Sequence, residues 1–327
     1  MSQSLLIASQ GAMSPSDPSA ALRLSQQAPA FLQSHSSSQP KFPFSLFAAP
    51  ETPELWMQYE QLLRACLRTG DDKSARECLE RLSKRFGPAN DRIMGLRGLY
   101  DEALAADAGS LQNILNGYEE ILAENPVNVP ISKRRIALLR SMDRIADAIA
   151  ALVEFLDAFP TDAEAWSELA DLYHSQGMRS QAIFCLEEAL LVAPNAWNLH
   201  ARLGELEYIS ATVADSQDAA LRLSADAVKR FCRSIELCDD YLRGYYGLKL
   251  STERLLEKIT GKGSSASKGE GGLPTRETLQ KLQALSTRKL REIVESRAKD
   301  KQSWERNQSE LIAAQALLDN YKGSQTQ

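Results

Sequence analysis

Residues 163–196, AEAWSELADLYHSQGMRSQAIFCLEEALLVAPNA, contain the pattern that decides the fold of this chain. In the first half, four apolar residues follow the spacing i, i+3, i+4 and i+7, which places them on one face of a helix. They are Trp166, Leu169, Ala170 and Tyr173. In the second half, Ala182 is small enough for two helices to approach closely, and Pro194 is expected to end the second helix. The stretch therefore predicts a helical hairpin.

The same order of residues recurs along the chain at intervals of 34 residues. Pro126, Pro160 and Pro194 are spaced 34 residues apart, and further copies begin near Trp56 and at Trp197. This order of aromatic, small and closing proline residues is typical of the tetratricopeptide repeat. A single hairpin cannot bury its own apolar face, so consecutive copies must stack. We predict an all-α tetratricopeptide-repeat α-solenoid of about five and a half helical hairpins, with C-terminal capping helices.

Composition and periodicity divide the chain into four segments. They are a Ser/Pro-rich head at 1–50, the tetratricopeptide-repeat array at 51–259, a flexible linker at 260–275 and C-terminal helices at 276–321. The head is expected to be largely disordered because of its Ser, Pro and Gln content, although a short helix is allowed from Pro18 to Leu32. The aromatic stretch KFPFSLF at 41–47 could dock onto the first hairpin.

Two copies are longer than the 34-residue repeat. The second copy has four extra residues, which we place in its turn around Asp107 to Ser110. The fifth copy is longer by about eleven residues, which we place in the turn SATVADSQDAA at 210–220.

Composition restricts the functional class. The net charge of −5 argues against general nucleic-acid binding, which requires a basic surface. No stretch approaches the roughly 18 to 20 continuous apolar residues of a membrane span. The start, MSQSLLIASQ, resembles no secretory signal, and Arg23 is the only arginine among the first 50 residues, which disfavours a mitochondrial presequence. Five cysteines without a C-x-x-C motif suggest no disulfide framework or zinc site and favour a reducing compartment.

The sequence carries no pattern that is typical of a catalytic site. The three histidines, His35, His174 and His200, have no Cys or Asp partner at the spacing of metal ligands. The sequence also lacks the nucleophile elbow, the phosphate-binding loop, the H-E-x-x-H motif and the dinucleotide fingerprint. We therefore expect no enzyme activity, no cofactor and no bound metal.

The expected function lies on the surface of the array. Stacked hairpins form a concave groove and a convex back. By analogy with tetratricopeptide proteins, the first helix of each pair lines the groove. The candidate partner-binding residues at these positions are Lys133, Arg140, Glu164, Asp171, His174, Asn198, Glu205 and Tyr208, and Arg134 joins them as a neighbour of Lys133.

Positive charge in the array is densest in one short segment of the third copy. Its members are Lys133, Arg134, Arg135, Arg140 and Arg144. One interpretation is a solvated helix face that carries ion pairs at i,i+4 spacing. The other is a docking patch for an acidic partner segment or for lipid headgroups, which a positive surface field would attract.

Several segments resemble the family of subunit 2 of the endoplasmic-reticulum membrane protein complex. The closest resemblance is in AWSELADLYHSQGMRSQAIFCLEEALLVAPN at 165–195. Other segments agree in order and spacing. They are ECLERLSKRF at 77–86, GYEEILAENPVN at 117–128, SKRRIALLRSMDRIADAI at 132–149 and RGYYGLKLS at 243–251. The resemblance covers roughly residues 55 to 255, whereas the head, the long fifth turn and the linker do not match the family pattern.

The resemblance implies a non-catalytic scaffold subunit on the cytoplasmic face of the endoplasmic-reticulum membrane. Its partners would be other subunits of that complex, through the cytosolic domains of the integral membrane subunits, so the protein would be part of a hetero-oligomer with only indirect membrane contact. The complex inserts tail-anchored and weakly hydrophobic transmembrane segments. The alternative function is a soluble adaptor that binds short peptide segments in its concave groove. A third is a regulatory subunit of transferase or RNA-processing machinery.

Overall fold

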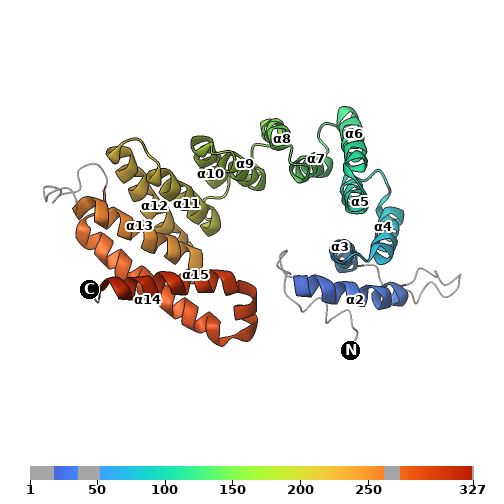
Figure 1. Cartoon of the computed structure of the whole chain (residues 1–327). Coiled ribbons are helices and arrows are strands. Elements are labelled where there is room, and N and C mark those ends of the chain that lie inside the picture. Colours follow the sequence, from blue (N-terminus) through green and yellow to red (C-terminus); the bar gives the residue numbers. More distant parts are fainter. Residues whose placement is uncertain (1–17, 36–51, 261–272, 326–327) are drawn as a thin grey trace. The chain divides into compact units, whose positions relative to one another are not determined.

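The computed structural model describes residues 18–35, 52–260 and 273–325, which are helical apart from short connections (Figure 1). The helices are α2 (Pro18–Ser34), α3 (Pro53–Thr69), α4 (Asp72–Phe86), α5 (Asp91–Leu104), α6 (Ala108–Glu124), α7 (Val129–Ser141), α8 (Ile145–Ala158), α9 (Ala163–Ser175), α10 (Arg179–Val192), α11 (Trp197–Thr212), α12 (Gln217–Leu237), α13 (Leu242–Thr260), α14 (Arg276–Lys299) and α15 (Lys301–Gln325). They fall into two compact units, unit 1 (Met1–Ala151) and unit 2 (Leu152–Gln327). The predicted all-α class is confirmed.

Side chains at the start of several helices satisfy backbone N–H groups that have no partner within the helix. Asp71 accepts a hydrogen bond of 3.1 Å from the Ser74 amide where α4 begins, and Asp162 accepts one of 2.9 Å from the Ala165 amide where α9 begins. Each such cap is worth about 1 kcal/mol. Between α3 and α4, Gly70 has a φ of 75°, which favours glycine. The local sequence therefore determines where these helices begin and turn.

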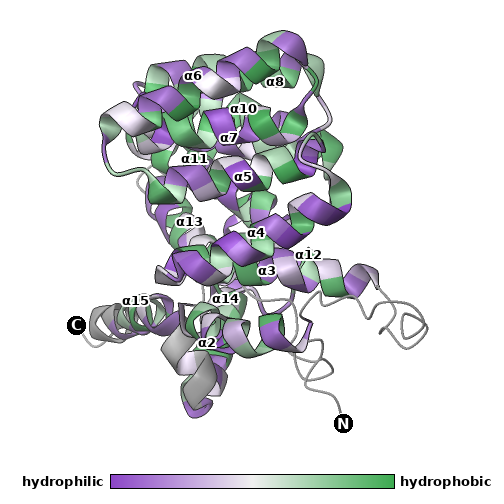
Figure 2. Cartoon of the chain, turned by 90° about the vertical axis from the view of Figure 1, so that its right-hand side faces the viewer, coloured by the Kyte–Doolittle hydropathy of each residue, from purple (hydrophilic) through white to green (hydrophobic). Residues whose placement is uncertain are grey.

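The helices carry both hydrophilic and hydrophobic residues, as amphipathic helices that pack on one side do (Figure 2). In unit 1, α3 pairs with α4, and α7 packs on both α5 and α6. In unit 2, α9 pairs with α10, and α11 pairs with α12. These hairpins fall where the 34-residue spacing predicts them, so the tetratricopeptide-repeat α-solenoid is confirmed as the fold class.

Helix α2 packs on the first hairpin of unit 1. Phe31 of α2 and Tyr59 of α3 meet edge-on in the core, with ring centroids 5.2 Å apart. Arg81 of α4 donates hydrogen bonds of 2.9 Å to the carbonyl oxygens of Leu32 and His35, at the C-terminal end of α2. A cation there is favourable because the last carbonyl groups of a helix lack partners within it. The short helix allowed in the head is therefore present and attached.

The core of unit 2 is tightest around Phe231 of α12. An ideal Cβ on Gly247 of α13 would lie 2.2 Å from the Phe231 ring, and one on Gly204 of α11 would lie 3.1 Å from it. Because glycine has no side chain, both helices can press against this ring, which is buried. The three helices therefore meet around one aromatic side chain.

The C-terminal helices continue unit 2 beyond the repeats. Helix α14 packs against α13, and α15 packs against α14. Their buried apolar residues belong to the core of unit 2. They are Leu279, Leu290, Ile293, Val294, Leu311, Ala314 and Leu318. The predicted helices at the C-terminal end of the array are therefore present.

The eleven extra residues of the fifth copy do not form the long turn that we expected. Helix α11 continues to Thr212 and α12 already begins at Gln217. The Ser216 hydroxyl caps α12 by accepting a hydrogen bond of 3.2 Å from a backbone amide three residues later. The next turn buries Ala220 and Leu221 in the core of unit 2. The prediction was wrong because a helical conformation lets Ala220 and Leu221 bury their side chains, which stabilises helix over an extended connection.

The second copy departs from its prediction in the same way. Helix α5 ends at Leu104 and α6 begins at Ala108, so most of the segment from Asp107 to Ser110 is helical. Asp107 caps α6 by accepting a hydrogen bond of 2.7 Å from the Ser110 amide. The extra residues therefore lengthen α6 instead of widening the turn.

Two of the sequence-based expectations concern residues outside the described parts of the chain. These are the docking of the aromatic stretch at 41–47 and the flexible linker around 261–272. Among the helices that the structure describes, none combines the length and the apolar character needed to cross a membrane.

Candidate functional site

The nine candidate partner-binding residues lie on three helices. Helix α7 in unit 1 carries three of them, namely Lys133, Arg134 and Arg140. Helices α9 and α11 in unit 2 carry the other six, namely Glu164, Asp171, His174, Asn198, Glu205 and Tyr208. The predicted set is therefore divided between the two units.

Arg134 takes part in a contact inside unit 1. Its Nε donates a hydrogen bond of 3.0 Å to Oε1 of Glu102, and its Nη2 donates to Oε2 of the same carboxylate. The Tyr118 hydroxyl donates a hydrogen bond of 2.5 Å to Oε1 of Glu102. Burial, together with this bond to a carboxylate, raises the pKa of Tyr118 above its usual range. Arg134 therefore joins α7 to α5 and α6, which is a structural role.

The other basic residues of the cluster differ in their surroundings. Arg144 donates hydrogen bonds of 2.7 Å to Asp147 and 3.3 Å to Gln112. Lys133 is half-buried, whereas Arg140 is exposed. The interpretation as a solvated face with local ion pairs fits Arg144. Lys133 and Arg140 stay candidates for partner binding.

A chain of charged contacts links α9 to α11 in unit 2. Arg202 of α11 donates a hydrogen bond of 2.9 Å to Asp171 of α9. The same guanidinium donates one of 3.0 Å to Glu205, which lies one turn further along α11. Asp171 and Glu205 were both selected from the repeat register, and Arg202 holds them on a shared surface. Arg202 itself was missed because it falls between the positions expected to line the groove.

The remaining candidates on α9 and α11 differ in their exposure and surroundings. Glu164 and Asn198 are exposed, whereas His174 is half-buried. The Nδ1 atom of His174 is buried and has no hydrogen-bond partner within the described residues. Tyr208 is half-buried, and the Arg254 guanidinium lies over its ring at 5.5 Å from the centroid. The Tyr208 ring thus packs against a cation.

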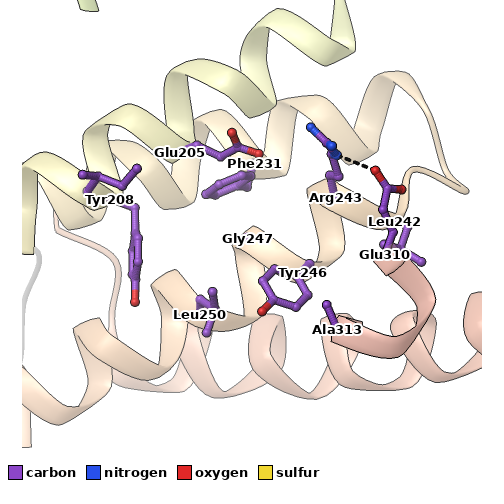
Figure 3. A pocket seen from close by; sticks show the side chains of 11 residues that line it. Glu205, Tyr208, Phe231, Leu242, Arg243, Tyr246, Gly247, Leu250, Glu310 and Ala313 are labelled. Atoms are coloured by element: carbon purple, nitrogen blue, oxygen red, sulfur yellow. Dashed lines mark hydrogen bonds and ion pairs between the residues drawn. The ribbon is translucent and has the colours of Figure 1, made fainter. Parts of the chain in front are cut away.

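A pocket of about 350 Å³ opens among α11, α12, α13 and α15, all in unit 2 (Figure 3). Two predicted residues, Glu205 and Tyr208, belong to its lining. Most of the other lining residues are apolar or aromatic. They are Ile209, Phe231, Leu242, Tyr246, Leu250 and Ala313, with Gly247 between the helices. Two of the residues predicted to bind partners therefore line a mainly apolar cavity.

An ion pair between two helices borders this pocket. Arg243 Nε of α13 lies 2.9 Å from Oε1 of Glu310 on α15 (Figure 3). The pair attaches α15 to α13, so that α15 supplies one wall of the pocket. Tyr208 extends from α11 and Tyr246 from α13 toward the same space (Figure 3). Aromatic and aliphatic walls with charged groups at the edge are typical of a site that binds an apolar group.

Sequence reasoning did not identify Arg243, Tyr246 or Glu310. A weak signal for the first two was available, because Gly244 and Gly247 are closely spaced on α13 and closely spaced glycines can mark helices in near contact. Glu310 lies on α15, outside the 34-residue register, and its place follows only from tertiary packing.

Unit 2 also buries a carboxyl group on α11. The side chain of Glu207 on α11 is only 6% exposed. Its Oε1 lies 3.6 Å from Nε of Arg230, and its Oε2 has no hydrogen-bond partner within the described residues. Burial raises the pKa of Glu207 to about 8, although the nearby Arg230 acts in the opposite direction. Glu207 is therefore largely protonated in the folded protein at neutral pH.

Four of the cysteines have thiols whose pKa values are raised by burial. Burial raises the pKa of the Cys66, Cys185 and Cys232 thiols to about 11 and that of Cys78 to about 12, so these groups stay protonated and are poor nucleophiles. Within the same residues, no group of three or more His, Cys, Asp or Glu side chains is arranged to hold a metal ion.

The sequence of this chain is similar to those of several known proteins. A family model described as the EMC2 TPR-like repeat domain matches residues 96–219, which include all nine candidate residues. TPR repeat protein oca3 of Schizosaccharomyces pombe is 38% identical over 204 residues, or 62% of this chain and 68% of that protein. ER membrane protein complex subunit 2 of Xenopus tropicalis is 34% identical over 199 residues, or 61% of this chain and 63% of that protein.

The chain thus aligns with about two thirds of the length of these relatives. A solved structure of a tetratricopeptide-repeat protein from Thermus thermophilus is 26% identical and covers 58% of this chain and 98% of its own, with a TM-score of 0.38. The repeat spacing and the helical hairpins are those of a tetratricopeptide-repeat protein, and the sequence matches extend over most of the repeats. The chain belongs to the family of ER membrane protein complex subunit 2, a family of tetratricopeptide-repeat proteins.

Proposed function

We propose that this protein is a non-catalytic scaffold subunit of an endoplasmic-reticulum membrane protein complex. The observation that carries the proposal is the family membership: relatives aligned over about 60% of this chain are named subunit 2 of that complex. The surfaces of stacked hairpins support it, since repeat arrays bind partners over extended faces. The protein would lie on the cytoplasmic face and contact the membrane through its partner subunits.

In the proposed mechanism, the protein acts by fixing the positions of its partner subunits. The array would hold the cytosolic domains of the integral membrane subunits in a fixed arrangement, while other subunits insert tail-anchored and weakly hydrophobic transmembrane segments. Preorganised helices suit this role because less conformational entropy is lost when a partner binds a surface that is already ordered. The candidate contacts are Lys133 and Arg140 in unit 1, and Glu164, Asp171, His174, Asn198, Glu205 and Tyr208 in unit 2. Arg134 is the least suitable, since Glu102 already binds it.

Purification from native membranes tests the proposal. The tagged full-length chain should be recovered with several integral membrane proteins in fixed stoichiometry, and alkaline carbonate should release it from the membrane fraction. Recovery with a changing set of soluble proteins would reject the scaffold function. Retention of the chain in carbonate-washed membranes would reject indirect attachment.

Charge reversal tests the candidate residues of unit 1. Lys133→Glu combined with Arg140→Glu should reduce recovery of the partner subunits, because an acidic partner segment would be repelled. The control is Arg144→Glu, since Arg144 already interacts with Asp147 and Gln112. Equal recovery with the double variant and with the wild type would remove this patch from the proposed interface.

The alternative, a soluble adaptor for short peptides, is favoured by one observation. The pocket among α11, α12, α13 and α15 is concave and mainly apolar, as sites for peptide side chains are. The adaptor would exchange its ligands, whereas the scaffold would keep its partners through purification. Washing the immobilised complex with excess salt and measuring which proteins remain separates the two functions.

A further inference from the structure

The apolar core at the N-terminal end of unit 1 stops at α5. Ile93 and Leu96 of α5 belong to the same buried cluster as residues of α2, α3 and α4. Among the described residues, the buried side chains of α6 and α7 lie outside that cluster. They are Leu115 and Tyr118 on α6, and Ile131, Ile136, Leu138 and Leu139 on α7. Apolar packing therefore unites α2, α3, α4 and α5 into one body, which we name the N-terminal body.

The joint between this body and the α6–α7 pair is made partly by backbone. Helix α5 packs on both helices of the pair. An ideal Cβ on Gly95 would lie 2.9 Å from Cβ of Pro130 on α7, and one on Gly98 would overlap the Tyr118 ring of α6. Glycine permits such a close approach but has no side chain to bury. Because hydrophobic stabilisation scales with the apolar area removed from water, these two positions add little of it to the joint.

Hydrogen bonds close the joint at both ends of α5. At the N-terminal end, Nδ2 of Asn128, a residue that is 1% exposed, donates a hydrogen bond of 3.1 Å to Asp91. At the C-terminal end, the Glu102 carboxylate accepts two hydrogen bonds from Arg134 of α7 and one from the Tyr118 hydroxyl of α6. The Glu102 side chain is only 12% exposed. We call these two sets of contacts the latch.

A joint held in this way has a closed and an open arrangement. A bidentate bond between an arginine and a carboxylate requires one geometry, and its groups form hydrogen bonds with water once they are displaced. The chain crosses from α5 to α6 through residues 105–107, close to Glu102. This short connection is the natural pivot, so that an opening moves the Asp91–Asn128 contact furthest.

We propose that the joint between α5 and the α6–α7 pair is a hinge, and that the latch holds it closed. When the latch breaks, the N-terminal body turns about residues 105–107 relative to α6 and α7. Packed interfaces switch between discrete arrangements because they do not deform continuously. The hinge is a property of this chain alone and does not depend on the proposed scaffold function.

A distance measured across the joint tests the hinge. Spin labels are placed on the full-length chain at Lys84→Cys on α4 and Glu124→Cys on α6, because both positions are exposed. Cys238→Ser removes one native thiol, and burial keeps the other four protonated and poorly reactive. Pulsed electron paramagnetic resonance then gives the distribution of distances between the labels. The latched protein should show one narrow distribution.

Two latch variants and a matched control are compared in this labelled chain. Glu102→Gln weakens the bond to Arg134, and Asp91→Ala removes the acceptor of Asn128 at an exposed position. Each should raise the fraction of chains with a second, different distance on the order of tenfold, since a hydrogen bond to a charged group is worth at least that factor.

The control is Glu60→Gln, which breaks a bond of the same kind inside the N-terminal body. The Glu60 side chain is also 12% exposed and accepts hydrogen bonds of 2.6 and 2.8 Å from Arg92, which join α3 to α5. Because this bond does not cross the joint, the distance distribution should stay narrow. Circular dichroism and thermal melting confirm that each variant is folded, and the exposed Asp91→Ala serves as the test if Glu102→Gln is not.

Two other outcomes overturn the hinge. A narrow, unchanged distribution in the folded latch variants means that the joint is rigid without the latch. An equal change in Glu60→Gln and in the latch variants means that unit 1 loosens as a whole and has no hinge at α5. The scaffold function is judged separately, by whether the wild-type chain is recovered with membrane subunits, so it can stand while the hinge fails.

Discussion

Replacement of Glu207 by glutamine would measure how much the buried carboxyl group in unit 2 lowers the free energy of unfolding. The Glu207 side chain is 6% exposed, and its nearest cation, Arg230, lies 3.6 Å away. Its Oε2 has no hydrogen-bond partner within the described residues. Desolvation outweighs the attraction to Arg230, so the pKa rises from 4.5 to about 8. Glutamine has nearly the shape of the protonated acid and cannot ionise.

The sign and size of the effect follow from proton linkage. The folded state binds the proton of Glu207 more tightly than the unfolded state, so this group opposes folding only where the unfolded chain is ionised. Well below pH 4.5 both states are protonated and the penalty is absent. The penalty grows as the pH rises through 4.5 and levels off above about pH 8. At roughly 1.4 kcal/mol per tenfold change in proton affinity, the penalty is on the order of 3 kcal/mol at pH 7.

The assay is urea denaturation of the full-length chain between pH 4.5 and 9, followed by circular dichroism. Glu207→Gln should raise the free energy of unfolding by about 3 kcal/mol at pH 7 and by little at pH 4.5. Glu187→Gln is the control, because Glu187 also contacts Arg230 at 3.4 Å but is 49% exposed. A stability difference that is the same at both ends of the pH range would refute the reasoning. So would a Glu207→Gln protein that is less stable than the wild type at pH 8.

Three further substitutions probe packing. Glu102→Ala should lower the free energy of unfolding by roughly 2 kcal/mol in urea titration, because it leaves the half-buried Arg134 without its carboxylate; an unchanged midpoint would contradict the structural role of that pair. Gly247→Ala should lower the thermal midpoint, since its Cβ would lie 2.2 Å from the Phe231 ring and overpacking typically costs about 1–3 kcal/mol. Gly117→Ala should raise the midpoint slightly, because nothing beyond the neighbouring backbone of its own helix lies within 4 Å of the added Cβ and alanine favours a helix by up to ~1 kcal/mol.

The repeat spacing was sufficient to predict the hairpins but not the exact helix lengths. Pro126, Pro160 and Pro194 recur at intervals of 34 residues, so the positions of α9 and α10 followed directly. The segment 210–220 was assigned to a turn because it exceeded the repeat length. Whether an insertion extends a helix depends on the burial that neighbouring helices offer, and Leu221 finds such burial in unit 2.

The candidate site was only partly predictable, for a similar reason. Glu205 and Tyr208 were found because repeat register determines which way a first helix faces. Arg243 and Glu310 form one border of the pocket, but they are 67 residues apart and only the packing of α15 joins them. Arg134 was selected for its charge alone, and the sequence does not reveal that a glutamate 32 residues earlier binds it.

The attachment of α2 by Arg81 has a practical consequence for anyone who shortens this protein. A version that starts at Pro53 would keep every repeat, yet it would uncover the apolar side of α3 at Tyr59, which packs against Phe31 of α2 and is almost fully buried in the intact chain. We expect the shortened protein to self-associate in solution, because this apolar surface would be exposed. Expression trials should therefore keep the N-terminal boundary ahead of Pro18.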